Sequence, residues 1–240
     1  MRYGLISDIH SNLEALQNVI HAVEQSVDEW VCLGDLVGYG ANPNECVETI
    51  RELTPHVIAG NHDRAAVGLT SINYFNPIAK AAIVWTGRVL RKENKEYLKK
   101  LKLTLGIDNS YLVHSSPSDP SAWQYIFSLD DAVYEFSHFK EQICFIGHSH
   151  LAFAILEGGG DYRIVEEPKF TLNAEQRYLI NVGSVGQPRD LDPRACCVVW
   201  DSEEHTLEFV RVEYEVEKVQ EKIVEAGLPQ FLADRLKYGR

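Results

Sequence analysis

Aspartate, asparagine and histidine recur in five short segments of the first 150 residues. The segments are Asp8-Ile9-His10, Gly34-Asp35, Gly60-Asn61-His62-Asp63, His114 and Gly147-His148-Ser149-His150. Carboxylate, amide and imidazole donors suit manganese, iron, cobalt, nickel or zinc better than calcium, which prefers oxygen alone. The set has no thiolate, which argues against a structural zinc knot. Two adjacent divalent metals held by such ligands are chiefly a tool for displacement at phosphorus.

Each of these segments follows a short apolar run that is typical of a buried strand. The runs are Tyr3–Ile6, Trp30–Leu33, His56–Ala59, Ser110–His114 and Ile143–Gly147. Ligands delivered from successive strand ends are expected to converge at one edge of a sheet. If strand geometry persists through His10, the side chains of Asp8 and His10 project to the same side.

Helical patterns alternate with the early strands and predict parallel pairs with right-handed crossovers. Ser11 and Glu14 have the spacing of a capping box at the start of the first helix. Helices are expected over Asn12–Glu24, Pro43–Leu53, Ala79–Leu90, Glu93–Leu101, Asp130–Phe139, Val216–Glu225 and Pro229–Leu236.

Consecutive strands follow His150 and predict a second, largely antiparallel sheet. They are Leu151–Leu156, Tyr162–Val165, Phe170–Leu172, Tyr178–Val182, Ala195–Trp200 and Leu207–Tyr214. We find no convincing linker, so residues 1–240 are expected to form one domain with short C-terminal helices at about 216–236.

The composition limits the partners of the chain. A net charge of −12 argues against extended nucleic-acid binding, which depends on neutralising phosphates, but it allows a small anionic phosphoester. No window approaches the ~18 apolar residues of a membrane span, and no secretory leader precedes Tyr3–Ile6. The cysteines, which contain no CxxC pair, suit a reducing cytoplasm; they are Cys32, Cys46, Cys144, Cys196 and Cys197. A homo-oligomer is neither indicated nor excluded.

The charges of the candidate ligands favour an anionic substrate. Two divalent ions outweigh the carboxylates of Asp8 and Asp35, even with a bridging hydroxide between the ions. Such a site stabilises the charge that develops on phosphoryl oxygens during in-line attack. His62 is the candidate proton donor to the leaving group, and Asp63 is expected to orient it or raise its basicity.

The ordered blocks DxH, GD, GNHD, H and GHSH resemble those of the calcineurin-like metallophosphoesterases over residues 8 to 150. The segment from Asn181 to Arg189 is similar to the bacterial and archaeal phosphodiesterases of that superfamily. The resemblance implies an α/β fold, a four-layer αββα sandwich of two mixed β-sheets, with the metals at strand ends between the sheets.

The resemblance also implies roles for single residues. One metal ion would be bound by Asp8, His10, Asp35 and His150. The other would be bound by Asp35, Asn61, His114 and His148. Asp35 would bridge the two ions and His62 would protonate the leaving group. Manganese heads the candidate metals, followed by iron, nickel, cobalt or zinc.

One departure from the family pattern bears on the substrate. In the protein phosphatases of the superfamily the GD block continues into Asp-Arg-Gly, whose arginine grips the phosphate, whereas this chain has Gly38-Tyr39-Gly40. Arg64 or Arg189 is a candidate substitute. We therefore predict a phosphodiesterase that acts on a small phosphodiester or nucleotide-type substrate. The alternatives are a phosphomonoesterase, a dinucleoside polyphosphate hydrolase, another binuclear hydrolase, or a non-catalytic interaction scaffold.

Overall fold

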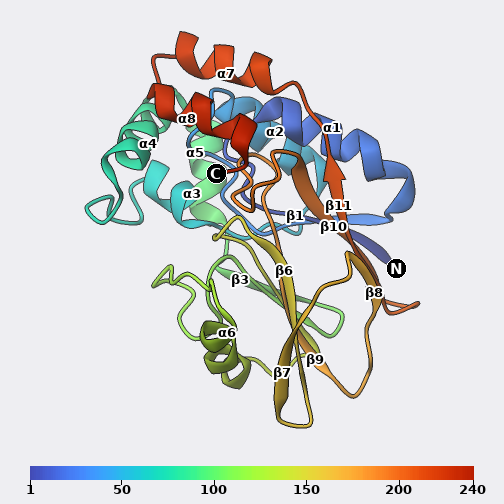
Figure 1. The fold of residues 1–240 in the computed structure, drawn as a ribbon. Helices are drawn as coiled ribbons and strands as arrows, with labels where there is room; N and C mark the ends of the chain where they lie inside the picture. The colour runs from blue at the N-terminus through green and yellow to red at the C-terminus, as the bar shows by residue number, and fades with distance from the viewer.

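Two mixed β-sheets lie between helical layers in the computed structural model, which describes residues 1–240 (Figure 1). The first sheet has the order β2-β1-β10-β11-β8, and the second has the order β3-β4-β5-β9-β6-β7. The strands of the first sheet are β1 (Arg2–Ile6), β2 (Glu29–Cys32), β8 (Lys169–Thr171), β10 (Ala195–Asp201) and β11 (Thr206–Val212). Those of the second are β3 (Thr104–Ile107), β4 (Ser110–Val113), β5 (Ile143–Ile146), β6 (Ala152–Gly158), β7 (Asp161–Val165) and β9 (Arg177–Val182).

Helices cover the outer face of each sheet. The first sheet lies beneath α1 (Leu13–Val23), α2 (Pro43–Leu53), α3 (Asn61–Ala66), α4 (Pro77–Val89), α5 (Lys92–Lys100), α7 (Val216–Glu225) and α8 (Gln230–Asp234). On the far side, α6 (Leu129–Glu135) covers the second sheet (Figure 1). This layering confirms the predicted αββα sandwich.

Successive side chains of a strand belong to different apolar layers of the core. In β5, Ile143 and Phe145 belong to the apolar cluster between the sheets, whereas Cys144 and Ile146 belong to the cluster beneath α6. Successive side chains of a strand point to opposite faces, so a strand buried on both faces is apolar throughout. The ends of these strands are thereby fixed by burial on two sides.

Two of the predicted local elements are wrong. The run His56–Ala59 forms only isolated bridges, from Val57 to Cys32 and from Ile58 to Lys102, and no strand. The first helix begins at Leu13 and is capped by Asn12, whose side chain accepts a hydrogen bond from the Ala15 N–H. Ser11 cannot serve as the predicted cap because its backbone is left-handed, with φ 58°.

The strands after His150 do not form a sheet of their own, which corrects a further prediction. The strands β10 and β11 extend the sheet of β1 and β2, while β9, β6 and β7 extend the sheet of β4 and β5. The segment between β9 and β10 therefore crosses from one sheet to the other. The sequence pattern also did not predict β3 or α3.

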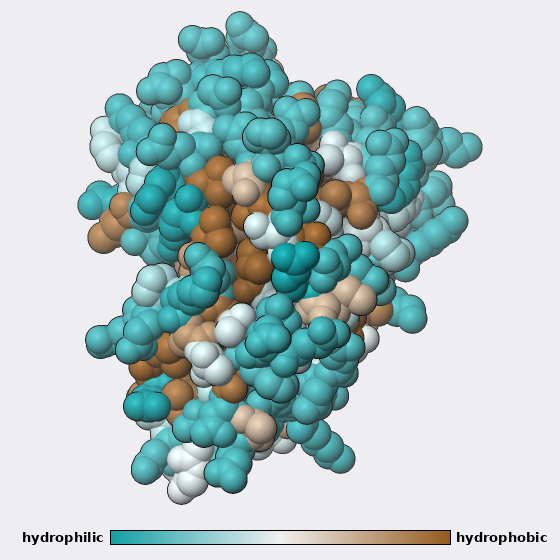
Figure 2. Space-filling view, turned by 90° about the vertical axis from the view of Figure 1, so that its right-hand side faces the viewer, coloured by the Kyte–Doolittle hydropathy of each residue, from teal (hydrophilic) through white to brown (hydrophobic).

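The surface agrees with the composition. On the face shown in Figure 2, hydrophilic residues predominate, and hydrophobic residues gather in a band between the upper and lower parts of the molecule. The five cysteines are buried and unpaired. None of the helices is both long enough and apolar enough to span a membrane.

Candidate metal centre

Backbone hydrogen bonds join the loops that carry the candidate ligands. Each loop donates to or accepts from a loop that follows a different strand. The bonds run from Asp8 N to Gly34 O (3.0 Å), His10 N to Asp35 O (2.9 Å), Gly147 N to His114 O (2.9 Å), Gly186 N to Asp8 O (2.9 Å) and Arg189 N to His150 O (3.1 Å). The loops consequently form one hydrogen-bonded unit at the ends of β1, β2, β4, β5 and β9.

Five of the candidate ligands have a left-handed backbone. They are Asp8, His10, Asp35, His148 and His150, with φ between 49° and 66°. Strand geometry therefore does not persist to His10 as assumed, and the side chains converge through strained turns instead. Each left-handed non-glycine residue lowers the stability of the fold by about 1–3 kcal/mol. Such residues persist only where the surrounding structure holds them in place.

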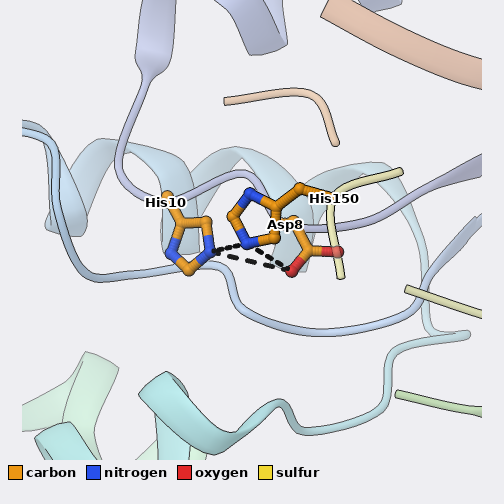
Figure 3. Close-up of side chains that lie close together, drawn as sticks. All are labelled: Asp8, His10 and His150. Atoms are coloured by element: carbon orange, nitrogen blue, oxygen red, sulfur yellow. Dashed lines mark hydrogen bonds and ion pairs between the residues drawn. The ribbon is translucent and has the colours of Figure 1, made fainter. Parts of the chain in front are cut away.

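The first group of ligand atoms comprises Asp8, His10 and His150, all buried (Figure 3). The Nε2 atoms of His10 and His150 lie 3.1 Å apart. The Asp8 Oδ1 lies 3.2 Å from the His150 Nε2 and 3.7 Å from the His10 Nε2. Ligands that share an ion at ~2.0–2.2 Å lie roughly 3–3.6 Å from one another, so these three atoms suit one ion.

The second group comprises Asp35, His114 and His148, whose ligand atoms lie within 4.8 Å of one another. The Asp35 Oδ2 lies 3.3 Å from the His114 Nε2 and 3.5 Å from the His10 Nε2. The carboxylate of Asp35 thus lies between the two groups. This position is the one expected of a bridging ligand.

Four histidine rings are oriented by backbone carbonyls. His10 Nδ1 donates to Val37 O (3.1 Å), His114 Nδ1 to Leu33 O (2.7 Å), His150 Nδ1 to Gln187 O (2.6 Å) and His148 Nε2 to Trp123 O (2.9 Å). A carbonyl only accepts, so each of these nitrogens carries a proton, and the other nitrogen of each ring is left to bind an ion once it is deprotonated. Ligating histidines in metal sites are held in this way.

Several buried polar atoms at the site lack a hydrogen-bond partner. They include the Asp8 Oδ1, the Asn61 Oδ1 and the His114 Nε2. An unpaired buried polar atom is costly, and native structures rarely leave one without a role. All three atoms are metal ligands by chemistry, so the residues present fit bound divalent ions.

The carboxylates and histidines of the site shift one another's pKa. Burial alone would raise the pKa of Asp8, but His150, His10 and His114 hold it well below its usual range. Burial would lower the pKa of His114, yet Asp35 and Asp8 raise it to about 9. Without metal, a proton on His114 therefore offsets part of the carboxylate charge, a role that cations would take over.

His62 differs from the four oriented histidines. Its buried Nδ1 has no hydrogen-bond partner, and its ring lies between those of Tyr39 and Phe75, with centroids 4.5 and 5.0 Å away. Burial lowers the pKa of His62 to about 3. One ring nitrogen of His62 lies within 4.8 Å of the ligand atoms of His10 and Asp35, so His62 stands beside both groups of ligands.

Asp63 is not positioned as expected. Its Oδ1 accepts from the Val37 N–H at 3.2 Å and its Oδ2 from the Gly60 N–H at 3.0 Å. These bonds cap α3 and fasten it to the loop after β2, so Asp63 orients the backbone before His62 rather than the imidazole ring. Burial, with repulsion from Asp35, raises the pKa of Asp63 to about 7.

The two candidate arginines have different surroundings. Arg64 lines a cleft next to His62. The guanidinium of Arg189 lies 5.7 Å from the centre of the Tyr39 ring, donates to the Gln187 side chain and has a buried Nε without a partner. Tyr39, which stands where the phosphatases have arginine, packs on His10 and His62.

The loop around Trp123 was missed by the sequence reasoning. The Trp123 backbone is left-handed, with φ 56°, which is unusual for a bulky residue. Its carbonyl accepts from His148, and its ring lies at an edge-on angle to His114, 6.2 Å between centroids. Tyr125 stacks on His148 at 4.0 Å. No local periodicity marks such a residue, because its partners are distant in sequence.

The segment from Asn181 to Gln187 packs against the ligand loops and forms hydrogen bonds with them. Asn181 donates to Gly147 O and Ser149 Oγ, both at 2.8 Å, and the Ser184 hydroxyl donates to Asp8 O at 2.8 Å. A Cβ on Gly186 would collide with the carbonyl of Ile9. Gly186 therefore permits close contact with the Asp8–His10 turn.

Comparison with known proteins identifies the family. The model of the calcineurin-like phosphoesterase superfamily domain matches residues 1–205. An uncharacterized protein of Methanocaldococcus jannaschii is 43% identical over 242 residues, which cover 99% of this chain and 98% of that protein. A metallophosphoesterase from Sphaerobacter thermophilus is 38% identical, with a TM-score of 0.89 over 100% of this chain and 99% of that one. A hypothetical protein from Pyrococcus horikoshii OT3 shares the fold at 18% identity, with a TM-score of 0.83 over 100% and 98% of the two chains. The chain belongs to the calcineurin-like phosphoesterase superfamily.

Proposed function

We propose that the protein is a binuclear metal-dependent phosphodiesterase that acts on a small phosphodiester or nucleotide-type substrate. The observation that carries this proposal is the orientation of His10, His114, His148 and His150. Each ring is held by a carbonyl, and each leaves its other nitrogen free beside Asp8 or Asp35. Family membership supports phosphoester hydrolysis as the reaction.

The proposed ligand sets are Asp8, His10, Asp35 and His150 for one ion, and Asp35, Asn61, His114 and His148 for the other. Manganese is the proposed metal, because oxygen and imidazole donors without thiolate suit it. Bound ions would supply a water of lowered pKa and stabilise negative charge on the phosphoryl group.

The protein's own groups supply the remaining parts of the reaction. His62 is the proposed proton donor, because it lines the cleft beside the candidate ligands. Burial lowers its pKa, and a substrate anion next to the ring would raise that pKa again and favour the protonated form. Arg189 and Arg64 are the proposed contacts to substrate anions. The Gly38-Tyr39-Gly40 turn makes a phosphoprotein substrate less suitable, since it brings no guanidinium to the phosphate.

A panel assay with manganese-loaded protein tests the reaction class. The substrates are an aryl phosphodiester, an aryl phosphomonoester, cyclic nucleotides and dinucleoside polyphosphates, with metal content measured in parallel. We expect the aryl diester to be cleaved faster than the monoester. Full metal content without hydrolysis of any substrate would contradict the enzyme hypothesis and favour a non-catalytic interaction scaffold. Faster cleavage of the monoester or the polyphosphates would select one of those alternatives.

Two variants test the roles. We expect His62→Ala to lose about 10²–10⁴-fold in kcat while keeping its metal, and Asp35→Asn to lose both metal and activity. His21→Ala is the control, since the His21 side chain is 88% exposed. Full activity in Asp35→Asn would contradict the two-metal arrangement, and loss of metal in His62→Ala would reassign His62 as a ligand.

A further inference from the structure

A cleft with a volume of about 650 Å³ opens directly beside the metal centre. Asn61, His62 and His148 form its inner wall, and its outer walls come from the 69–76 and 121–125 segments. Its volume lies within the range of small-molecule sites, about 300–1,000 Å³. A phosphoester bound at the centre would therefore extend its organic group into this cleft.

The cleft is free of acidic side chains although the protein is strongly acidic. The chain has 35 aspartates and glutamates and a net charge of −12, yet none of these residues lines the cleft. Arg64 is the one lysine or arginine that does. This local charge pattern suits an anionic ligand and disfavours a cationic one.

Aromatic rings dominate the apolar part of the wall. Tyr39, Tyr74, Phe75, Trp123 and Tyr125 all line the cleft. Tyr74 is 94% exposed and Tyr125 is 46% exposed, so both present ring surface to solvent. Phe75 lies against His62, and the aromatic wall therefore begins next to the proposed proton donor. Exposed aromatic surface gathered at a site indicates a binding function.

We propose that this cleft selects phosphoesters whose organic group carries a planar aromatic ring, either a simple aryl group or a nucleobase. Tyr74 and Phe75 are the proposed specificity residues, because they offer ring surface without contacting the candidate metal ligands in the described structure. The inference deepens the proposed function and rests on it. Stacking of a ligand ring on protein aromatics raises affinity about tenfold or more.

Binding of phosphonates to the metal-loaded protein tests this inference without turnover, because their C–P bond is not hydrolysed. Phenylphosphonate, cyclohexylphosphonate and methylphosphonate share a head group and differ in the organic group. We expect calorimetry to show phenylphosphonate binding about tenfold more tightly than methylphosphonate, and more tightly than cyclohexylphosphonate. The methylenephosphonate analogue of AMP separates the two sources: tighter binding than phenylphosphonate indicates a nucleobase, and weaker binding indicates a smaller aryl group.

Variants locate the effect. Tyr74→Ala combined with Phe75→Leu should reduce the phenyl-to-methyl affinity ratio towards one while leaving methylphosphonate affinity unchanged. Tyr134→Ala is the matched control, because Tyr134 is 60% exposed and lies outside the cleft. Equal affinities for phenylphosphonate and methylphosphonate, equal affinities for the phenyl and cyclohexyl compounds, or an unchanged ratio in the double variant would each overturn the inference. Failure of the proposed function appears separately, as absence of diester hydrolysis by the same preparation.

Discussion

Gly60 is the residue whose replacement most directly tests the geometry of the metal centre. Its φ is −92° and its ψ is 174°, a conformation open to any residue, so alanine would meet no backbone strain. An added Cβ would, however, lie 2.6 Å from the Asp35 Cγ and closer still to its Oδ1 and backbone nitrogen. Gly60→Ala must therefore displace Asp35 from its place between the two groups of ligands.

Two effects determine how much stability Gly60→Ala should lose. Overpacking of a filled site costs about 1–3 kcal/mol. Displacing the Asp35 carboxylate also breaks the 2.8 Å hydrogen bond from the His62 N–H, and a bond to a charged group contributes about 1.5–3 kcal/mol. We expect Gly60→Ala to lower the free energy of unfolding of the metal-free protein by about 2.5–6 kcal/mol, and to lower metal affinity by about tenfold or more.

Urea denaturation of metal-free protein and calorimetric titration with Mn²⁺ measure these two quantities. Gly106→Ala is the matched control, because a Cβ there meets nothing closer than the Ser110 carbonyl at 3.6 Å. If Gly60→Ala unfolds like the control and binds manganese with wild-type affinity, the close approach of Gly60 to Asp35 is not what fixes the carboxylate.

Three further perturbations test other parts of the structure. Adding Mn²⁺ at 100 times its Kd should stabilise the metal-free protein by about 2.7 kcal/mol, seen as a raised Tm; an unchanged Tm would argue against specific binding. Trp123→Ala should reduce tight metal binding from two ions to one by elemental analysis, because it removes the ring beside His114 and frees the left-handed turn whose carbonyl accepts from His148; retention of two ions would contradict that role. Lys222→Met should cost about 1–2 kcal/mol at pH 7, because it removes the 2.6 Å partner of buried Glu14. Burial opposes ionisation of Glu14, but Lys222 and Lys218 lower its pKa. The stabilisation from the ion pair is therefore present above pH ~4.5 and is lost as the pH falls through the lowered pKa. An equal loss at pH 7 and at pH 3 in urea denaturation would refute the ion-pair explanation.

The strand-end ligands could be predicted from the sequence because their signals are local. Runs such as Ile143–Ile146 are short, apolar and followed at once by polar donors, and the structure places strands there. The run His56–Ala59 has the same local pattern but makes only single bridges, one to Cys32 and one to Lys102. Sheet membership depends on such distant partners, and so does the placement of β10 and β11.

Within the candidate site, the grouping of the residues was predictable and their orientation was not. Asp63 stands beside His62 in sequence, yet its carboxylate reaches the backbone of Gly60 and Val37. Trp123 carries no metal-binding donor in its side chain, so its type gives no hint that its carbonyl orients His148. Left-handed turns at Asp8 and His10 likewise arise from the hydrogen bonds between loops, which no single segment encodes.

The candidate ligands come from both sheets. Asp8, His10 and Asp35 follow β1 and β2 of the first sheet, whereas His114, His148 and His150 follow β4 and β5 of the second. An ion bound by both sets would act as a cross-link between the halves of the sandwich. We expect metal to slow amide hydrogen exchange most in the strands that face each other across the inter-sheet core, far from the ion itself. Removal of the metal by a chelator would then weaken the packing between the two sheets before either sheet unfolds.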